Sequence, residues 1–228
     1  MMTPEIIYED EDLYVCYKPA GMATQTASVT RPDMISFLRN YRASQGQETY
    51  IGVIHRLDQP VEGLVIFAKN KKAAVNLTKQ VQEHQVQKQY LCIVTNLELP
   101  SQGTLEDYLI KDSKNQIART VAKDTPQCKR AKLSYQALET VDDKRLLEVS
   151  LETGRFHQIR CQFANQDAPL LGDQKYGGES NAGLCLMSHR ICFYHPRTRK
   201  DMDFSLNPRG TQFQKFHCLQ DVSTPTTR

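Results

Sequence analysis

The stretch GVIHRLDQPVEGLVIFAKN, residues 52–70, places a single carboxylate, Asp58, between two runs of apolar residues. The run at 63–68 is typical of a buried strand, and a shorter strand is expected at 51–54. A charge at the end of a buried strand is unfavourable unless it is paired or used in chemistry. The pattern therefore indicates a strand, a loop with a special acid, and a second strand.

Working outward from this stretch, strands outnumber helices. Two short strands joined by an acidic turn are expected within residues 5–26, followed by an amphipathic helix at 31–44 with Pro32 in its first turn. Further strands are expected at 51–54, 63–68, 90–96, 133–138, 145–151 and 184–194, and further helices at 70–88 and 156–165. Hairpin-like connections prevail, which favours an α+β fold with a large, mainly antiparallel central sheet and flanking helices.

Length and composition favour one ordinary domain. The 228 residues suit a single domain, 1–228, or one domain split into two lobes, and a polar tail is expected from about residue 215. There is no export signal, and no run approaches the roughly twenty apolar residues that a membrane span needs. The seven cysteines form no CxxC pair, which argues against a zinc site or disulfide framework and favours a cytoplasmic location.

Basic residues are unevenly distributed along the chain. Residues 1–50 hold 4 basic and 7 acidic side chains, whereas the whole chain has a net charge of +3. The basic segment, residues 111–132, contains seven cations: Lys111, Lys114, Arg119, Lys123, Lys129, Arg130 and Lys132. Such a segment suits a polyanion such as RNA. A solvated, flexible loop explains the same composition, and both interpretations remain open.

Four motifs could carry chemistry. They are HRLD at 55–58, KQYL at 88–91, GRFHQIR at 154–160 and PLLGDQKYGG at 169–178. Each has an ordinary explanation, because an Asp beside an Arg is usually an ion pair and a Tyr that begins a strand usually packs in the core. A Ser-based hydrolase is not favoured, since the chain lacks a Gly-x-Ser-x-Gly motif.

Together these motifs resemble the RluA-type RNA pseudouridine synthases. The order of IIYEDEDLYVCYKPAGM, HRLDQPVEGLVIFAK, KQYLCIV, GRFHQIRCQFANQDAPLLGDQKYG and ICFYHP is similar to that family over residues 5–205. The resemblance implies the pseudouridine synthase fold with a central RNA-binding cleft, and no S4-like domain in front of it. It also implies isomerisation of specific uridines in ribosomal or transfer RNA by a monomer, without cofactor, metal or membrane.

The resemblance assigns roles to three residues in particular. Asp58 corresponds to the catalytic aspartate, which either attacks the sugar or removes a sugar proton. Arg160 is its expected partner, because a guanidinium keeps its charge and its fork fits a carboxylate. Tyr90 corresponds to the family tyrosine that contacts the flipped base. The resemblance implies that its hydroxyl helps to remove the C5 proton, and its ring offers a stacking surface for uracil.

Four further residues are assigned to substrate binding. Arg56 is expected to brace the space that the flipped nucleotide leaves, and His55 is placed beside it. Arg155 and His157 either contact phosphates or cap the helix that follows, and both possibilities remain open. In the GDQKYG segment, Asp173 and Tyr176 are expected to fix a turn rather than to take part in chemistry.

The sequence departs from the family pattern at several positions. Val61-Glu62 stand where the family usually has Thr-Ser, and Phe156 stands where it usually has Thr. Ala168 and Met187 occupy places where His is common. Because Glu62 adds a second negative charge near Asp58, the departures leave an alternative function open: a catalytically inactive RNA-binding protein with the same fold.

Overall fold

The stretch at residues 52–70 folds as the sequence predicts. In the computed structural model, β3 (Gly52–Val53) pairs antiparallel with β4 (Glu62–Ala68), and the loop that contains Asp58 connects them. β4 is buried along its whole length, which explains its continuous apolar run. Asp58 therefore lies just before a strand whose side chains are all removed from water.

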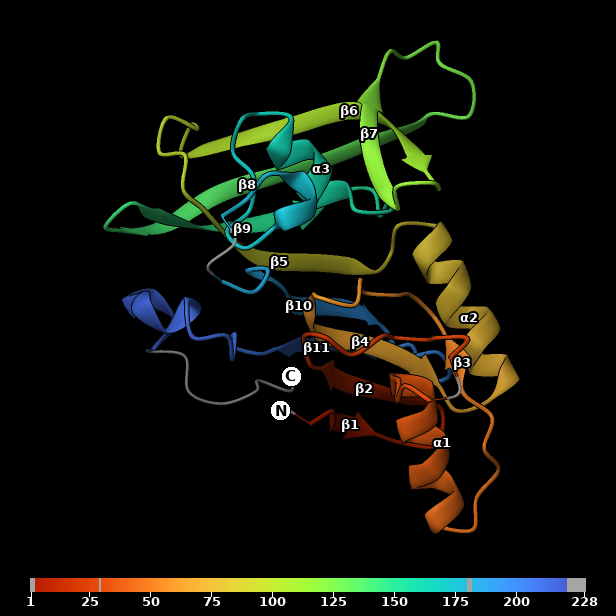
Figure 1. Ribbon diagram of the computed structural model, residues 1–228. Coiled ribbons are helices and arrows are strands. Elements are labelled where there is room, and N and C mark those ends of the chain that lie inside the picture. The colour runs from red at the N-terminus through yellow and green to blue at the C-terminus, as the bar shows by residue number, and fades with distance from the viewer. Residues whose placement is uncertain (1–2, 29, 180–181, 221–228) are drawn as a thin grey trace. The chain divides into compact units, whose positions relative to one another are not determined.

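The structure describes residues 3–28, 30–179 and 182–220. Contacts divide them into two units, which are described separately (Figure 1). Unit 1 contains the described residues up to Val86 together with Ser188–Leu206, and unit 2 contains Gln87–Met187 and the residues from Asn207 onward. The expectation that residues 1–228 form a single domain stays a prediction.

Unit 1 is built on a sheet with the strand order β1-β2-β4-β10. β3 adds to β4, and β11 adds to β10. The antiparallel pairs are β1 with β2, β2 with β4, β3 with β4, and β10 with β11. The other strands of this sheet are β1 (Glu5–Glu9), β2 (Leu13–Lys18), β10 (Leu186–Tyr194) and β11 (Asp201–Ser205).

Two helices cover opposite faces of the unit 1 sheet. Leu13 and Val15 of β2 share a buried cluster with Leu77 of α2 (Lys71–Gln82). The intervening Tyr14 instead packs edge-on against Tyr41 of α1 (Met34–Ser44), with ring centroids 6.3 Å apart. Because successive side chains of a strand point to opposite faces, α1 and α2 must lie on different sides of the sheet.

Side-chain caps set where these helices begin. Asp33 accepts a hydrogen bond from the Ser36 N–H, and the Ser36 hydroxyl accepts one from the Asp33 N–H, which forms a capping box. Pro32 therefore precedes the cap, and its expected place in the first turn is wrong. α2 begins after Asn70, whose side chain accepts the Ala73 N–H, and it ends at Gln82, earlier than the expected residue 88.

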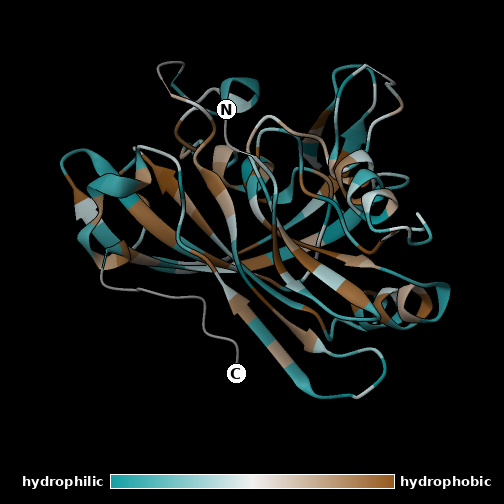
Figure 2. Cartoon of the chain, turned by 90° about the horizontal axis from the view of Figure 1, so that it is seen from below, coloured by the Kyte–Doolittle hydropathy of each residue, from teal (hydrophilic) through white to brown (hydrophobic). Residues whose placement is uncertain are grey.

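Unit 2 contains an antiparallel sheet with the strand order β5-β9-β8-β6-β7. Its strands are β5 (Gln87–Val94), β6 (Gln102–Asp112), β7 (Ile117–Val121), β8 (Lys129–Val141) and β9 (Lys144–Leu151). Figure 2 shows hydrophobic and hydrophilic residues together along the strands, and mostly hydrophilic residues in the turns.

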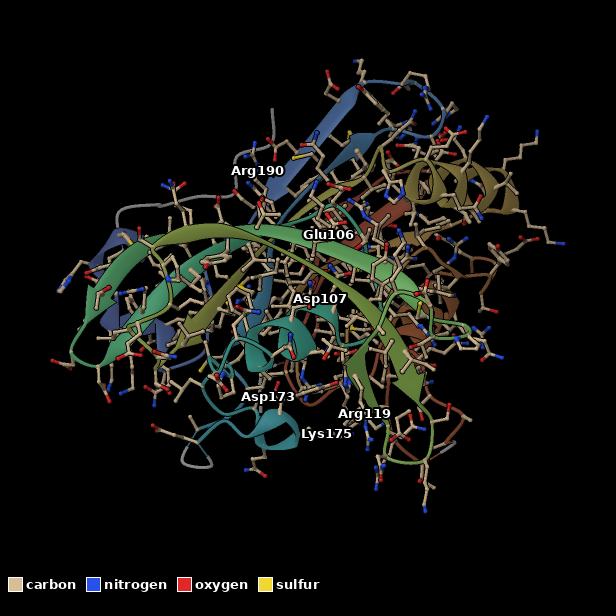
Figure 3. The ribbon with its side chains drawn as sticks, turned by 90° about the horizontal axis from the view of Figure 1, so that it is seen from above. Glu106, Asp107, Arg119, Asp173, Lys175 and Arg190 are labelled. Atoms are coloured by element: carbon tan, nitrogen blue, oxygen red, sulfur yellow. The ribbon has the colours of Figure 1, made fainter. Side chains whose placement is uncertain are left out.

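The helix α3 (Gln158–Ala164) covers one face of the unit 2 sheet. Ala131 of β8 packs with Cys161 of α3, and Asp107 of β6 accepts a hydrogen bond of 2.6 Å from Gln162. The neighbouring Glu106 points to the other face, where it binds Arg130; Figure 3 labels both acids on β6. Alternation along β6 and β8 therefore separates a face packed by α3 from an exposed face.

Most predicted elements are confirmed, and the α+β class with a mainly antiparallel sheet is confirmed with them. β6, β7 and β11 were not predicted. The basic segment is not a loop throughout, because it contains the end of β6, the whole of β7 and the start of β8. None of the helices in the described residues has the length and apolar composition needed to cross a membrane.

The segment near residue 215 is folded. Two short 3-10 helices, Phe213–Lys215 and His217–Leu219, follow one another there. Phe213 and Phe216 are buried in a cluster with Leu91 and Ile93 of β5. The expected polar tail is therefore wrong for residues 215–220, and residues 221–228 lie outside the described part of the chain.

Candidate active site

Asp58 is held by hydrogen bonds on both of its neighbours. The Thr24 hydroxyl donates to the Leu57 carbonyl at 3.0 Å and accepts from the Leu57 N–H at 3.1 Å. On the other side, the Gln59 carbonyl accepts from the Gly21 N–H at 2.8 Å, and the Gln59 amide donates back to the Gly21 carbonyl at 2.9 Å. The loop after β2 thus fixes the backbone around a partly exposed carboxylate.

Lys18 joins the same two loops from inside. Its ammonium group is buried and donates to the carbonyls of Pro19, Met22 and Gln59 at 3.1, 2.7 and 3.2 Å. Burial lowers the pKa of Lys18 to about 8, while the negative charges of Asp58 and Glu62 act in the opposite direction. Lys18 was not among the predicted site residues, because a lysine at the end of a strand is usually exposed.

The two departures before Gly63 are both accommodated inside unit 1. Val61 is buried, and the buried carboxylate of Glu62 accepts a hydrogen bond of 2.6 Å from the Tyr17 hydroxyl. Gly63 has a positive φ of 123°, and a Cβ there would lie 2.3 Å from the Ser188 carbonyl oxygen. Only glycine allows the Gly63 backbone to come this close to Ser188. Glu62 therefore stands directly before a residue whose backbone conformation is fixed.

The two basic residues before Asp58 have different surroundings. His55 is buried, and its Nε2 accepts the Ile66 N–H of β4 at 3.2 Å, so this nitrogen carries no proton. Arg56 is exposed and has no hydrogen-bonding or ionic partner among the residues that the structure describes. The structure therefore ties the His55 ring to the scaffold and leaves the Arg56 guanidinium accessible.

In unit 2, Arg160 forms a bidentate ion pair with Asp173. Nε and Nη2 each lie 2.7 Å from an Asp173 oxygen, and both side chains are buried. Asp173 was expected only to fix a turn; it does accept the Tyr176 N–H through its carbonyl, but it also orients the guanidinium. Asp58 belongs to the other unit, and its pairing with Arg160 stays a prediction.

His157 extends this network. Because a guanidinium can only donate, the 3.0 Å contact between Arg160 Nη1 and His157 Nε2 requires that Nε2 accepts. The neutral ring then carries its proton on Nδ1, which donates to the Tyr176 hydroxyl at 3.0 Å. That hydroxyl in turn accepts the Ala118 N–H of β7 at 2.6 Å. Three elements of unit 2 thus position the Arg160 side chain.

Phe156 covers the outer side of His157. The two rings are stacked with centroids 3.9 Å apart, and Lys111 Nζ lies 4.8 Å from the centre of the Phe156 ring. Burial, followed by the positive charges of Arg160, Lys175 and Lys111, lowers the pKa of His157 to about 3. The departure from Thr at residue 156 therefore adds an apolar cover over the histidine that contacts Arg160.

Neither Arg155 nor His157 caps α3 with its side chain. His157 occupies the N-cap position with a positive φ of 51°, but it makes no side-chain capping bond. Arg155 is exposed, and its Nε donates to the Arg130 carbonyl of β8 at 2.8 Å. His157 therefore stands at the start of the helix without a side-chain cap, and the phosphate contacts of both residues stay predictions.

Tyr90 lies on β5 opposite Val149 and is almost fully buried. Two residues earlier on the same strand, burial lowers the pKa of Lys88. The Lys88 ammonium group approaches Gly154, since a Cβ built there would lie 3.9 Å from Nζ. The KQYL and GRFHQIR motifs therefore meet within unit 2, while the catalytic role of Tyr90 stays a prediction.

The basic segment is divided between two faces of the unit 2 sheet. Lys111 lies on the α3 side, next to Phe156, and its described neighbours include no acidic partner. The cations on the opposite face occupy the strand positions between residues that pack under α3. Each of these cations has an acidic partner. These pairs are Arg119 with Asp112, Arg130 with Glu106 and Glu152, and Lys132 with Glu152.

One group of side chains in unit 1 has the composition of a metal site. Asp10, Asp12 and His195 bring one ligand atom each within 4.8 Å of one another. The His195 Nδ1 accepts two backbone N–H groups, so its Nε2 carries a proton and donates to Asp10 at 2.7 Å. Arg197 donates to Asp12 at 2.7 Å. The donors are therefore engaged in a charge network that joins two turns.

Comparison with known proteins agrees with this arrangement. The family model for RNA pseudouridylate synthase matches residues 12–165. tRNA pseudouridine synthase C of Pasteurella multocida is 32% identical over 222 residues, which cover 88% of this chain and 90% of that protein. Ribosomal large subunit pseudouridine synthase D of Zymomonas mobilis is 31% identical over 217 residues, covering 88% of this chain and 68% of that protein.

A solved structure shares the fold. The human protein RNA pseudouridylate synthase domain containing 4 superimposes with a TM-score of 0.76 at 21% identity, covering 95% of this chain and 93% of that one. The family match spans the HRLD and KQYL motifs and includes the whole of GRFHQIR. The chain therefore belongs to the RluA-type family of RNA pseudouridine synthases and is an RNA-modifying isomerase.

Proposed function

We propose that the chain converts specific uridines of structured ribosomal or transfer RNA to pseudouridine, with Asp58 as the catalytic carboxylate. Both RNA classes are included because one relative is named for the ribosomal large subunit and another for tRNA. The N1–C1′ bond breaks, the uracil turns, C5 bonds to C1′, the C5 proton is released to water, and N1 takes up a proton. Nothing is oxidised or transferred, so the proposal needs no cofactor.

The observation that carries the proposal is the fixed backbone around Asp58. Hydrogen bonds on Leu57 and Gln59 hold the residue from both sides, while its own side chain stays partly exposed. A carboxylate held in this way can meet an anomeric carbon or a sugar proton with little reorganisation. Both the attack on the sugar and the removal of its proton fit this geometry.

Three further residues have roles in the proposed reaction: Arg160 and Tyr90 of unit 2, and Arg56 of unit 1. Arg160, oriented by Asp173, supplies a permanent positive charge for Asp58. Tyr90 contacts the base. The target uridine must leave its stack to be reached, and the exposed Arg56 fills the space that it leaves. Arg155, His55 and His157 support substrate binding, His55 through the scaffold that it holds.

Cations on the α3 side of unit 2 support RNA binding. Lys111 and Lys175 both act electrostatically on His157, so they lie near the Arg160 network rather than on the face where cations and acids alternate. Phosphates attract such unneutralised cations most strongly. The seven cysteines are all thiols, which supports a reducing cytoplasmic setting. The proposed enzyme acts as a monomer.

Release of tritium from RNA labelled at uridine C5 tests the proposal. The wild-type protein should release tritium, and Asp58→Asn should abolish release while RNA affinity changes less than about tenfold, because the acid acts after binding. Asp142→Asn, in the exposed turn between β8 and β9, is the matched control and should remain active. RNA binding without release by the wild type would instead establish the inactive RNA-binding alternative.

A further inference from the structure

Glu62 is the second carboxylate near Asp58, and it is unusual for its position. It begins β4, it is 5% exposed, and the Tyr17 hydroxyl donates to it at 2.6 Å. The family that the chain resembles usually has a serine there, so this charge is a property of the present sequence. Hydrogen bonds and nearby cations favour a buried carboxylate, and Tyr17 supplies one such hydrogen bond.

A cation lies close to Glu62: Lys18 of β2 is the register partner of Gly63, the residue that follows Glu62 on β4. Glu62 and Asp58 are the two charges that act on the Lys18 ammonium group, and both favour its protonated form. Lys18 is itself fully buried next to Tyr17 on β2. Without those two charges, burial would favour a neutral amine. The two acids thus share one cation, although Asp58 lies in the loop and Glu62 lies in the strand.

Lys18 is also the internal connection between the loops around Asp58. It donates to Pro19 and Met22 in the loop after β2 and to Gln59 in the loop before β4. An ammonium group has three N–H donors, which matches these three carbonyls, whereas a neutral amine has only two. Loss of its proton therefore removes one of the three contacts and the positive charge near Asp58.

We infer that Glu62 is a positioning residue for Asp58: held by Tyr17, it keeps Lys18 charged, and charged Lys18 ties together the two loops that fix Asp58. This inference rests on the proposed function, in which Asp58 is the catalytic carboxylate. In this role Glu62 acts on the reaction through the charge of Lys18.

The charge of Lys18 can be measured without any activity. The Nζ and Cε resonances of Lys18, assigned by their loss in Lys18→Arg, report its titration by NMR. In the wild type the midpoint should lie near pH 8. Glu62→Gln should lower the midpoint by about one pH unit, because one of two stabilising charges is removed. Glu62→Asp, which keeps the charge, should lower it less.

Glu83→Gln is the control for the loss of one carboxylate. Glu83 lies in unit 1 at the exposed end of α2 and should leave the Lys18 midpoint unchanged. Amide exchange of Gly21, whose N–H donates to Gln59, reports the loop contact at a fixed pH. Exchange should be faster in Glu62→Gln than in the wild type and unchanged in Glu83→Gln.

Activity gives a second readout. The rate of tritium release should fall as pH rises through the Lys18 midpoint, and Glu62→Gln should move this fall to lower pH by the same amount. Lys18→Arg should remove the fall, alone and combined with Glu62→Gln, since arginine keeps its charge. A merely structural role of Glu62 would lower the rate at every pH without moving the profile.

The outcomes are separable. An active wild type whose Lys18 midpoint is the same in Glu62→Gln would overturn the inference and leave the proposed function intact. A wild type that releases no tritium would overturn the proposed function, and with it the inferred role, even if the midpoint moves. If Glu62→Gln does not fold, Lys18→Arg alone decides: a persistent alkaline fall overturns the inference.

Discussion

At the scale of single residues, Arg160 and Asp173 form a buried bidentate ion pair in unit 2. Asp173→Asn should lower the free energy of unfolding by about 3–5 kcal/mol, because it removes the carboxylate from this buried pair. The control is Asp203→Asn. Asp203 binds Arg190 with similar geometry, but both side chains are about a third exposed or more, so this loss should be below about 1 kcal/mol.

Urea denaturation of both variants checks this prediction. Equal losses in the two would show that burial does not distinguish the pairs. Figure 3 labels one residue of each pair, Asp173 and Arg190. The Asp173 variant should also release tritium more slowly, since Arg160 would lose the partner that orients it.

Single residues also show where sequence reasoning stops. Asp58 and Arg160 were predicted from the HRLD and GRFHQIR motifs, whose order resembles that of a known family. Asp173 was not predicted as the partner of Arg160. The two residues are 13 positions apart, and their contact depends on the path of the turn that follows α3. Lys18 was missed because a lysine at the end of a strand is usually exposed, and its burial depends on two loops distant in sequence.

At the scale of elements, the β6–β7 hairpin was the largest omission. Its strands contain mostly exposed and half-buried residues, with one buried residue in each, so the segment lacks the apolar run that indicates a strand. By contrast, β4 and β5 were predicted because each contains a continuous apolar run. The hairpin is stabilised by the pairing of β6 with β8 and by packing under α3. Neither contact can be seen in a local sequence pattern.

The hairpin divides the basic segment, and this leads to a prediction about RNA binding. Lys111→Gln combined with Lys175→Gln should weaken RNA binding and reduce the slope of its salt dependence by about one for each lost phosphate contact. The matched control combines Arg130→Gln with Lys132→Gln. Those cations are already neutralised by Glu106 and Glu152, so the slope should stay the same.

Binding of a structured RNA at several salt concentrations, followed by fluorescence anisotropy, separates the two double variants. The interpretation of the basic segment as a merely solubilising surface would hold if neither changed the slope. A larger effect of the control than of the Lys111 and Lys175 pair would place the RNA on the other face of the sheet.

At the scale of the whole molecule, the two units contribute different parts of the proposed site. Unit 1 holds Asp58 between loops, and unit 2 orients Arg160 through Asp173 and His157. The motif order in the sequence indicated the family, and the α+β class followed from the excess of strands. The division into units could not be read from the sequence, because β10 and β11 return to unit 1 after a hundred residues in unit 2.

The stability of the whole chain should depend on His157 in acid. In the unfolded chain its imidazole binds a proton near pH 6.5, whereas the folded pKa is about 3. Between these values the unfolded state binds more protons, so the free energy of unfolding falls as pH decreases. For one group the slope is at most about 1.4 kcal/mol per pH unit.

His157→Gln removes this titration and keeps an acceptor for Arg160 and a donor for Tyr176. Its free energy of unfolding should be below that of the wild type at pH 7, and the difference should shrink as pH falls from 6.5 toward 4. His84→Gln, at an exposed residue after α2, is the control for the loss of one imidazole. Urea denaturation followed by circular dichroism measures both. A wild-type advantage that stays constant from pH 7 to pH 4 would show that His157 takes up its proton in the folded chain, and the tautomer that links Arg160 to Tyr176 would then be wrong.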